Sequence, residues 1–163
     1  MQKQGAGSSM REISLPDAQA TARLGHALAD VLRAGDCVLL EGDLGAGKTT
    51  LARALLRGLC DDGDMEVPSP SYTLVQVYDA PVAEVAHFDL WRLDGPEGLY
   101  ELGWDDAREG IVVVEWPQRL GGLTPPDALR ITLAPDAAGG RIARLEGWDT
   151  RLAQSAAFGA GEA

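Results

Sequence analysis

Residues 37–59 decide the fold, and they read Cys-Val-Leu-Leu-Glu-Gly-Asp-Leu-Gly-Ala-Gly-Lys-Thr-Thr-Leu-Ala-Arg-Ala-Leu-Leu-Arg-Gly-Leu. Cys37 to Glu41 is a short apolar run typical of a strand, and from Thr49 to Leu59 the leucines recur at helical spacing. Between them, Gly42-x-x-x-x-Gly47-Lys48-Thr49 matches a phosphate-binding loop at every required position. Glycine-rich stretches also occur as plain turns, but here a strand and a helix stand on the correct sides. The stretch therefore predicts a P-loop that binds Mg-ATP.

The loop residues predict the contacts of a bound nucleotide. Glycines let backbone N–H groups converge on phosphates, and the following helix adds its positive N-terminal end. We expect Lys48, an exposed loop cation, to act catalytically on the β- and γ-phosphates, and Thr49 to place its hydroxyl on Mg²⁺. Apart from Lys3, Lys48 is the sole lysine of the chain. The predicted ATP/ADP contacts in this region are Asp43, Leu44, Gly45, Ala46, Gly47, Lys48, Thr49 and Thr50.

A P-loop enzyme also needs a carboxylate beyond a neighbouring strand, to hold the metal or to orient water. Glu115 follows the β-branched run Ile111–Val114, and Asp89 ends an expected strand that contains His87. Ligands of α/β proteins bind at the carboxyl ends of the strands, so both acids are candidates. Each also fits a surface carboxylate at a strand end. His87 fits a satisfied, partly buried histidine as well as a catalytic one.

Three hydroxyl side chains, Ser69, Ser71 and Thr73, follow in a proline-stiffened loop after the P-loop helix. GTPases and ATPases keep a sensor of the γ-phosphate in this part of the chain. The same composition also fits a simple lead-in to a strand.

The rest of the chain predicts a mixed sheet covered by helices. Pro16 to Leu32 has the periodicity of an amphipathic helix, and Ile111 to Glu115 fits a strand that neighbours the P-loop strand. The fold class is therefore α/β, a three-layer P-loop NTPase-like fold with a mixed β-sheet flanked by helices. The remaining expected elements are short helices near Pro96–Leu102 and Asp105–Glu109, the strand pair Tyr72–Tyr78 with Val85–Trp91, and the strand pair Ala128–Leu133 with Arg141–Leu145.

Composition and charge limit the domains and partners. The length of 163 residues fits one P-loop ATPase domain, which we place at residues 13–150 between flexible tails at 1–12 and 151–163. A net charge of -11 disfavours tight, direct binding to nucleic acid. Without an apolar run long enough for a bilayer or an apolar signal core, a cytoplasmic protein with no membrane contact is expected. Cys37 and Cys60 lack metal-ligand spacing and fit buried apolar positions.

Four separate motifs, in order, resemble the signatures of the TsaE (YjeE-type) family. They are Gly42–Thr50, Ser69–Val75 (Ser-Pro-Ser-Tyr-Thr-Leu-Val), His87–Leu93 (His-Phe-Asp-Leu-Trp-Arg-Leu) and Glu115–Pro117 (Glu-Trp-Pro). Several motifs in sequence order are far more specific than a single P-loop, and the resemblance spans about Leu15 to Leu145. Ser71 stands where the family usually has threonine, and Trp91 where tyrosine is usual.

The resemblance implies a bacterial ATPase that supports TsaB and TsaD in making threonylcarbamoyladenosine at position 37 of tRNA, without performing the transfer itself. It implies that Thr49 and Glu115 are Mg²⁺ ligands and that Asp89 is the functionally required acid. We expect slow ATP turnover by the isolated chain, stimulation by the partners, and contact with tRNA only through them. The remaining implied site residues are Trp116 and Arg141, as nucleotide contacts, and the switch-like loop Ser69–Val75.

Three other functions fit a P-loop. A GTPase is disfavoured because guanine selection uses an Asn-Lys-x-Asp motif and the sequence has no asparagine. A small-molecule kinase ranks second, since such enzymes usually close an arginine-bearing lid, whereas the region after the P-loop helix is acidic and proline-rich until Arg92. A nucleotide-dependent binding module, in which hydrolysis only resets an interaction, is the third reading.

Overall fold

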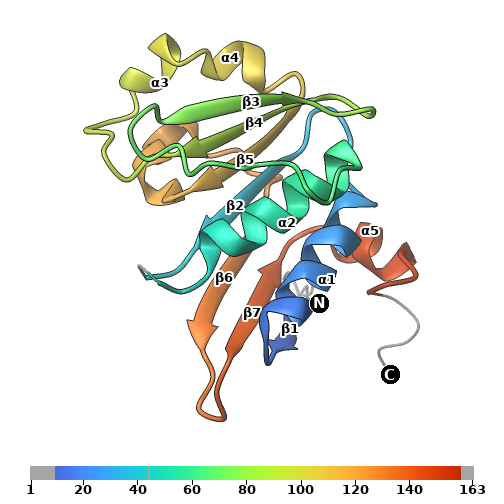
Figure 1. The fold of residues 1–163 in the computed structure, drawn as a ribbon. Helices are drawn as coiled ribbons and strands as arrows, with labels where there is room; N and C mark the ends of the chain where they lie inside the picture. Colours follow the sequence, from blue (N-terminus) through green and yellow to red (C-terminus); the bar gives the residue numbers. More distant parts are fainter. Residues whose placement is uncertain (1–9, 44, 159–163) are drawn as a thin grey trace, which may run out of the picture.

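The strand that precedes the glycine loop lies at the centre of a seven-stranded mixed sheet. The computed structural model describes residues 10–43 and 45–158. The strand order is β1-β7-β6-β2-β5-β4-β3, with helices on both faces (Figure 1). Among these residues no helix is long and apolar enough to cross a bilayer. The strands are β1 (Met10–Leu15), β2 (Cys37–Glu41), β3 (Val75–Asp79), β4 (Glu84–Asp89), β5 (Ile111–Glu115), β6 (Leu129–Pro135) and β7 (Arg141–Glu146). The helices are α1 (Ala18–Ala29), α2 (Lys48–Cys60), α3 (Gly98–Glu101), α4 (Trp104–Ala107), α5 (Asp149–Gln154) and the 3₁₀ segment η1 (Pro117–Leu123).

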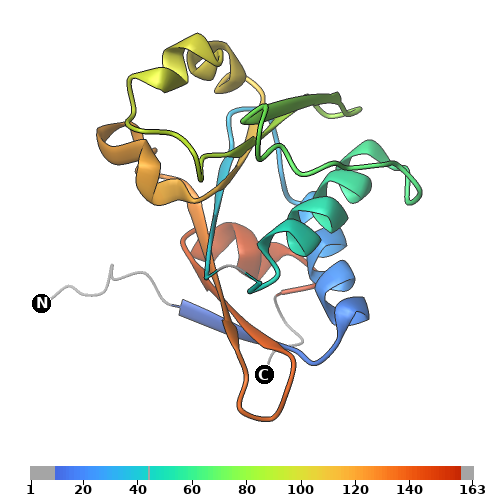
Figure 2. The same ribbon diagram turned by 60° about the vertical axis from the view of Figure 1, so that its left-hand side comes forward.

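The central strands are apolar on both sides because each face of the sheet packs into its own core. In β2, Val38 and Leu40 join the core that contains α1 and α2, whereas Cys37 and Leu39 join the core that contains α3 and α4. Successive side chains of a strand point to opposite faces, so a doubly covered strand requires an unbroken apolar run. Figure 2 shows α1 and α2 on one side of the sheet and α3 and α4 on the other. The predicted three-layer α/β fold is confirmed.

The strand directions bring three strand ends to one edge of the sheet. β2 runs parallel to β5 and β6, and β4 runs parallel to β5. Asp89 and Glu115, the last residues of β4 and β5, are register partners, and the glycine loop follows Glu41 at the end of β2. The predicted proximity of β5 to the P-loop strand is confirmed. The antiparallel pairings of β3 with β4 and of β6 with β7 are confirmed as well.

The strand predicted from Tyr72 begins three residues later than expected. Leu74 has a left-handed φ of 70°, and its N–H donates to the carbonyl of Pro70 at 2.6 Å, which closes a turn. β3 therefore starts at Val75. The turn keeps Ser71 and Tyr72 out of the sheet and places both beside the glycine loop.

Both predicted domain boundaries fall inside regular elements. The boundary after residue 12 divides β1, which pairs antiparallel with β7 along its whole length. The boundary after residue 150 divides α5, and beyond it Leu152 and Phe158 are buried in the core with α1 and α2. The prediction of tails was therefore wrong for residues 10–12 and 151–158, because both segments bury side chains or pair in the sheet. The outer parts of the predicted tails, 1–9 and 159–163, lie outside the described residues.

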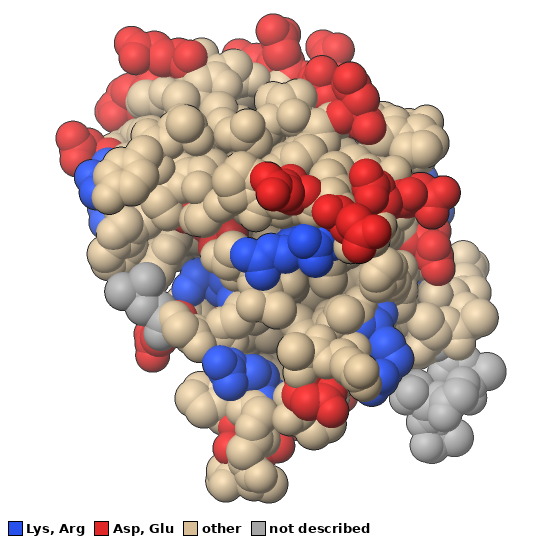
Figure 3. Space-filling model, viewed as in Figure 1, with Lys and Arg blue, Asp and Glu red and all other residues tan. Residues whose placement is uncertain are grey.

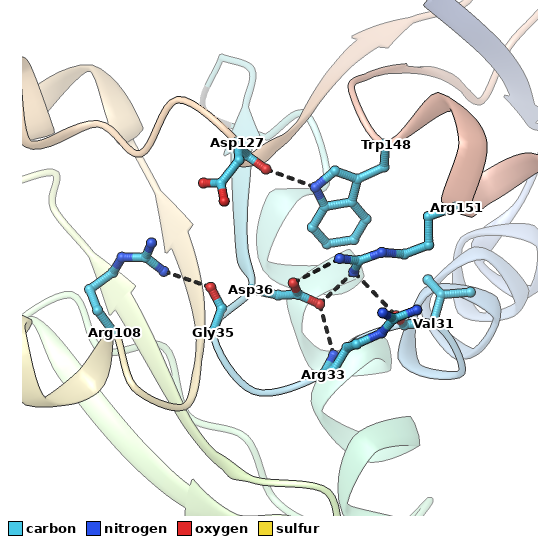
Figure 4. Close-up of polar contacts among 8 residues, drawn as sticks. All are labelled: Val31, Arg33, Gly35, Asp36, Arg108, Asp127, Trp148 and Arg151. Carbon is cyan, nitrogen blue, oxygen red and sulfur yellow. Dashed lines mark hydrogen bonds and ion pairs between the residues drawn. The ribbon is translucent and has the colours of Figure 1, made fainter.

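A salt bridge fixes α5 to the amino end of β2 (Figure 4). Arg151 donates from Nη1 and Nη2 to the two carboxylate oxygens of Asp36, at 2.6 and 3.1 Å. Its guanidinium also lies 4.0 Å from the ring centroid of Trp148, whose indole N–H donates to the carbonyl of Asp127. A bidentate pair fixes orientation as well as distance. These contacts explain why the chain stays folded beyond residue 150.

Candidate functional site

A cleft of about 530 Å³ lies where the carboxyl ends of β4 and β5 meet the glycine loop and the start of α2. Asp43 and Ala46, predicted nucleotide contacts, belong to the loop but not to the cleft lining, and Leu44 lies outside the described residues. The fold joins side chains that are far apart in sequence, such as Arg141 and the loop. The predicted site residues that do line the cleft are Gly45, Gly47, Lys48, Thr49, Thr50, Asp89, Glu115, Trp116 and Arg141, together with Ser69, Ser71 and Tyr72 of the predicted switch-like loop.

Two glycines give the loop its shape. Gly47, immediately before α2, has a φ of 103°, a conformation that residues with a Cβ rarely adopt. A Cβ on Gly42 would lie 2.7 Å from the carbonyl oxygen of Leu133, because the loop passes directly over β6. In the described part of the chain no side chain caps α2. Its first N–H groups are therefore available to phosphate oxygens.

Lys48 is buried, which corrects the expectation of an exposed loop cation. Only 5% of the residue is exposed, because its side chain turns back under the loop. The ammonium donates to the carbonyls of Gly42 and Asp43, at 2.5 and 3.0 Å, and lies 4.2 Å from the ring centroid of Trp116. Burial lowers the pKa of Lys48 below 10.5, and the neighbouring carboxylates oppose that shift. The cation is thus already positioned and largely desolvated before any ligand binds.

Glu115 joins the first turn of α2 to the sheet. The Thr49 hydroxyl donates to its Oε1 at 3.0 Å, and His87 Nε2 lies 2.7 Å from its Oε2. Glu115 is 2% exposed, so the surface-carboxylate reading of Glu115 is wrong, and His87 is fully and not partly buried. Within the described chain His87 Nδ1 has no partner. The two predicted Mg²⁺ ligands, Thr49 and Glu115, are therefore in direct contact.

Asp89 lies beside Glu115 and is tied to the hydroxyl-bearing loop. Its Oδ2 accepts from the Ser71 hydroxyl at 3.2 Å, and its Oδ1 accepts from the backbone N–H of Trp91 at the same distance. Ser69 and Ser71 contact each other at 3.0 Å. Asp89 is only 4% exposed, which rules out the reading of a surface carboxylate. The serine loop therefore reaches the cleft instead of only leading into β3.

Arg141 binds the glycine loop itself. Its Nε donates to the carbonyl of Ala46 and its Nη2 to that of Gly45, both at 2.8 Å. The C=O and N–H of a trans peptide point in opposite directions, so the Ala46 carbonyl bond directs the N–H of Gly47 away from Arg141. This arrangement orients the loop, and a direct contact of Arg141 with nucleotide stays a prediction.

Three further side chains line the cleft that were not among the individually predicted contacts: Tyr72, which lies in the predicted switch-like loop, and Trp91 and Arg92, which lie in the motif His87–Leu93. The rings of Trp91 and Trp116 lie 4.5 Å apart between centroids, and the Arg92 guanidinium lies 4.5 Å from the Tyr72 ring centroid. Tyr72 is 81% exposed. The signal in the sequence was that all three residues lie inside motifs that carry the family resemblance.

Comparison with known proteins gives the cleft a family context. The family described as "Threonylcarbamoyl adenosine biosynthesis protein TsaE" matches residues 15–143, which include every predicted site residue. The chain belongs to the TsaE family. The matched residues 15–143 include the glycine loop, both cleft carboxylates and Arg141.

Several relatives named "tRNA threonylcarbamoyladenosine biosynthesis protein TsaE" are similar over most of the chain. The protein from Synechocystis sp. is 44% identical over 117 residues, covering 69% of this chain and 73% of the relative. The protein from Nostoc sp. is 37% identical over 141 residues, covering 83% and 85%. The crystal structure of Bacillus subtilis YdiB superposes with a TM-score of 0.70 at 24% identity, covering 88% of this chain and 89% of that one. This last likeness shows a shared fold.

The resemblance predicted two departures from the TsaE motifs, at Ser71 and Trp91, and the structure shows the contacts of each. Ser71 stands in place of threonine and keeps a hydroxyl, which donates to Asp89. Trp91 stands in place of tyrosine, and its ring contacts Trp116 beside the buried ammonium of Lys48. The first difference preserves a polar contact, whereas the second enlarges the aromatic wall of the cleft.

Proposed function

We propose that this chain binds ATP with Mg²⁺ in the cleft and hydrolyses it slowly, in support of TsaB and TsaD during tRNA threonylcarbamoyladenosine biosynthesis. We place it in the cytoplasm, with tRNA contacted only through those partners. The observation that carries the proposal is the 3.0 Å contact between Thr49 Oγ1 and Glu115 Oε1. It joins the hydroxyl of a complete P-loop to a buried carboxylate from the neighbouring strand.

The charges of the cleft fit a divalent cation with a nucleotide. Asp89 and Glu115 are adjacent and almost fully buried, and both contribute to the field at Lys48. Two neighbouring carboxylates repel each other in a site of low dielectric, and a cation relieves that repulsion. Mg²⁺ is typically held by one or two protein oxygens plus phosphates and water. Thr49 and Glu115 supply that number, and the described residues contain no cluster of three or more His, Cys, Asp or Glu side chains suited to a metal.

Each cleft residue then has a distinct role. Lys48 exchanges its bonds to loop carbonyls for bonds to phosphate oxygens, while the N–H groups at the start of α2 receive the remaining phosphate charge. Thr49 and Glu115 hold Mg²⁺, which neutralises charge that develops on the phosphoryl group. Asp89 orients the attacking water, since its oxygens each retain acceptor capacity beyond the bonds from Ser71 and Trp91.

The arginines of the cleft explain why we expect slow turnover without partners. Arg92 stacks on Tyr72, and Arg141 is bound to the loop carbonyls. A nearby arginine, Arg119, donates to the carbonyl of Trp91 at 3.4 Å. An arginine that stabilises the transferred phosphoryl group contributes about 10³–10⁵ in rate. We infer that docking of TsaB and TsaD either supplies such a residue or releases one of these three.

Reconstitution tests the proposal. Purified chain is combined with TsaB, TsaD, tRNA, ATP and the threonylcarbamoyl donor, and modified tRNA is counted per TsaD molecule. Repeated product formation that requires both this chain and hydrolysable ATP supports the proposal. The same product yield without the chain contradicts it, and transfer of the γ-phosphoryl group to a small molecule would favour the kinase reading instead.

A further inference from the structure

His87 is fully buried in β4, on the same face as Val85, which belongs to the core that contains α1 and α2. In the parallel pairing of β4 with β5, His87 is opposite Val113, and Glu115 lies two residues further along β5 on the same face. This diagonal relation brings the imidazole to the carboxylate at 2.7 Å. A contact of this kind is set by strand register, so it is rigid.

The contact completes the hydrogen bonding of a buried carboxylate. Glu115 Oε1 accepts from the Thr49 hydroxyl, and Oε2 faces His87 Nε2. We assign the tautomer of His87 from this contact: an ionised carboxylate only accepts hydrogen bonds, so Nε2 is assigned as the N–H donor. With both oxygens engaged from opposite directions, the plane of the carboxylate is fixed and Oε1 points at the first turn of α2.

Packing alone does not explain a histidine at this position. In the described part of the chain Nδ1 has no hydrogen-bond partner, and a buried polar atom without a partner is unfavourable. The neighbours of His87 on this face, Val85 and Val113, are both fully buried and apolar. An aliphatic side chain would fill the space without that cost. The bond to Glu115 is therefore what the imidazole contributes.

We propose that His87 is a positioning residue, whose Nε2–H holds the Glu115 carboxylate in the orientation that binds Mg²⁺. The proposal rests on the proposed function, because it assigns Glu115 to the metal. His87 itself contacts neither metal nor nucleotide in this role. Groups that orient a metal ligand in this way typically change metal affinity by about 10–100-fold when they are removed.

Three substitutions of His87 separate positioning from packing. His87→Leu fills the site with an apolar side chain of similar bulk, but leucine has no hydrogen-bond donor. His87→Gln carries its amide nitrogen at about the reach of Nε2, whereas in His87→Asn the amide is one carbon shorter. Val85→Ala is the matched control, because Val85 is equally buried on the same face of β4 but pairs with Ile111, away from Glu115.

The measurement is ATP affinity by calorimetry, with Mg²⁺ and with EDTA, together with the thermal midpoint of each variant. We expect His87→Leu and His87→Asn to lose about 10–100-fold of the Mg²⁺-dependent gain in affinity and to keep the metal-free affinity. His87→Gln should retain most of that gain, and Val85→Ala all of it, despite a lower midpoint. If His87→Leu does not fold, the comparison of His87→Gln with His87→Asn is sufficient to test the positioning role.

The outcomes distinguish this proposal from the proposed function. If the wild-type chain shows no Mg²⁺-dependent gain in ATP affinity, both proposals fail. If wild type shows the gain and His87→Asn shows the same gain, the positioning role alone is wrong. Equal loss of the gain in Val85→Ala and in His87→Asn would reduce His87 to a packing residue.

Discussion

Lys48→Met is the sharpest test of the phosphate loop, because it removes the ammonium but keeps an unbranched stem of similar length. In the structure the ammonium donates to two carbonyls, those of Gly42 and Asp43, and lies over the ring of Trp116. Methionine can occupy the same space, so we expect the variant to fold. The variant therefore isolates the contribution of the charge.

The expected loss of ATP affinity in Lys48→Met follows from the hydrogen bonds that the ammonium makes in the structure. Since two of the three donors of Lys48 are bonded to loop carbonyls in the structure, nucleotide binding would exchange those bonds for stronger ones to phosphate and would not add three new ones. We therefore count one charge-assisted hydrogen bond, which contributes about 1.5–3 kcal/mol. The expected loss of ATP affinity is about 10–150-fold. Calorimetry of folded wild type and variant measures it directly.

The pH dependence gives an independent check. Burial lowers the pKa of Lys48 below 10.5, and phosphates bind the charged form, so ATP binding raises that pKa again. By linkage, wild-type affinity falls as the pH rises through the lowered pKa of the free protein, at a pH where an ordinary lysine is still charged. Lys48→Met should show no such fall. Equal affinities of the two proteins, or parallel pH profiles, would refute the assignment of Lys48 to the phosphates.

Four other predictions test the site and its surroundings. Glu115→Gln keeps the volume but not the charge, so ATP affinity should fall with Mg²⁺ and change little in EDTA; calorimetry showing equal losses would place Glu115 away from the metal. Asp89→Asn should bind ATP and dock to TsaB and TsaD yet lose partner-stimulated hydrolysis, because an amide is a poor base; phosphate release at the wild-type stimulated rate would make Glu115 the leading candidate. Arg151→Leu leaves Asp36, whose side chain is 11% exposed, without its cation, so the free energy of unfolding in urea should fall by about 1.5–3 kcal/mol. An unchanged midpoint would show that α5 is held by packing alone. ATP affinity is the control and should not change. The isolated chain should bind tRNA weakly at physiological salt by fluorescence anisotropy, and tight binding with a steep salt dependence would contradict this.

The centre of the fold and most of the site could be predicted because their signals are local. A strand, a glycine loop and a helix are contiguous in sequence, and the apolar run Ile111–Val114 showed that Glu115 would emerge at the edge of a buried strand. The carboxyl ends of parallel strands share one edge, so Asp89 and Glu115 were expected near the loop. In the structure they are register partners.

The predictions that were wrong concern features that depend on tertiary contacts, which local sequence patterns do not encode. β1 is an edge strand whose residues Arg11, Glu12 and Ser14 keep solvent exposure, so its apolar signal is weak. α5 is held by the pair of Arg151 with Asp36, 115 positions apart, and by the burial of Leu152 in the core. The burial of Lys48 follows from the turn of its side chain under the loop, and the contact of His87 with Glu115 follows from strand register. Each of these needs the tertiary arrangement, not the local pattern.

The distribution of charge bears on two ligands that the proposed function involves, ATP and tRNA. In Figure 3 several clusters of acidic side chains lie along the upper edge and right side of this face, whereas most of the Lys and Arg side chains seen there lie in its lower half. Lys48, Arg92 and Arg141 line the cleft. A short polyphosphate can enter the cleft and reach these cations, but a long polyanion must also lie across acidic surface, where repulsion opposes it. Under the proposed function we therefore expect the chain to bind ATP in preference to tRNA, because a few cations lie in the cleft of a chain whose net charge is -11.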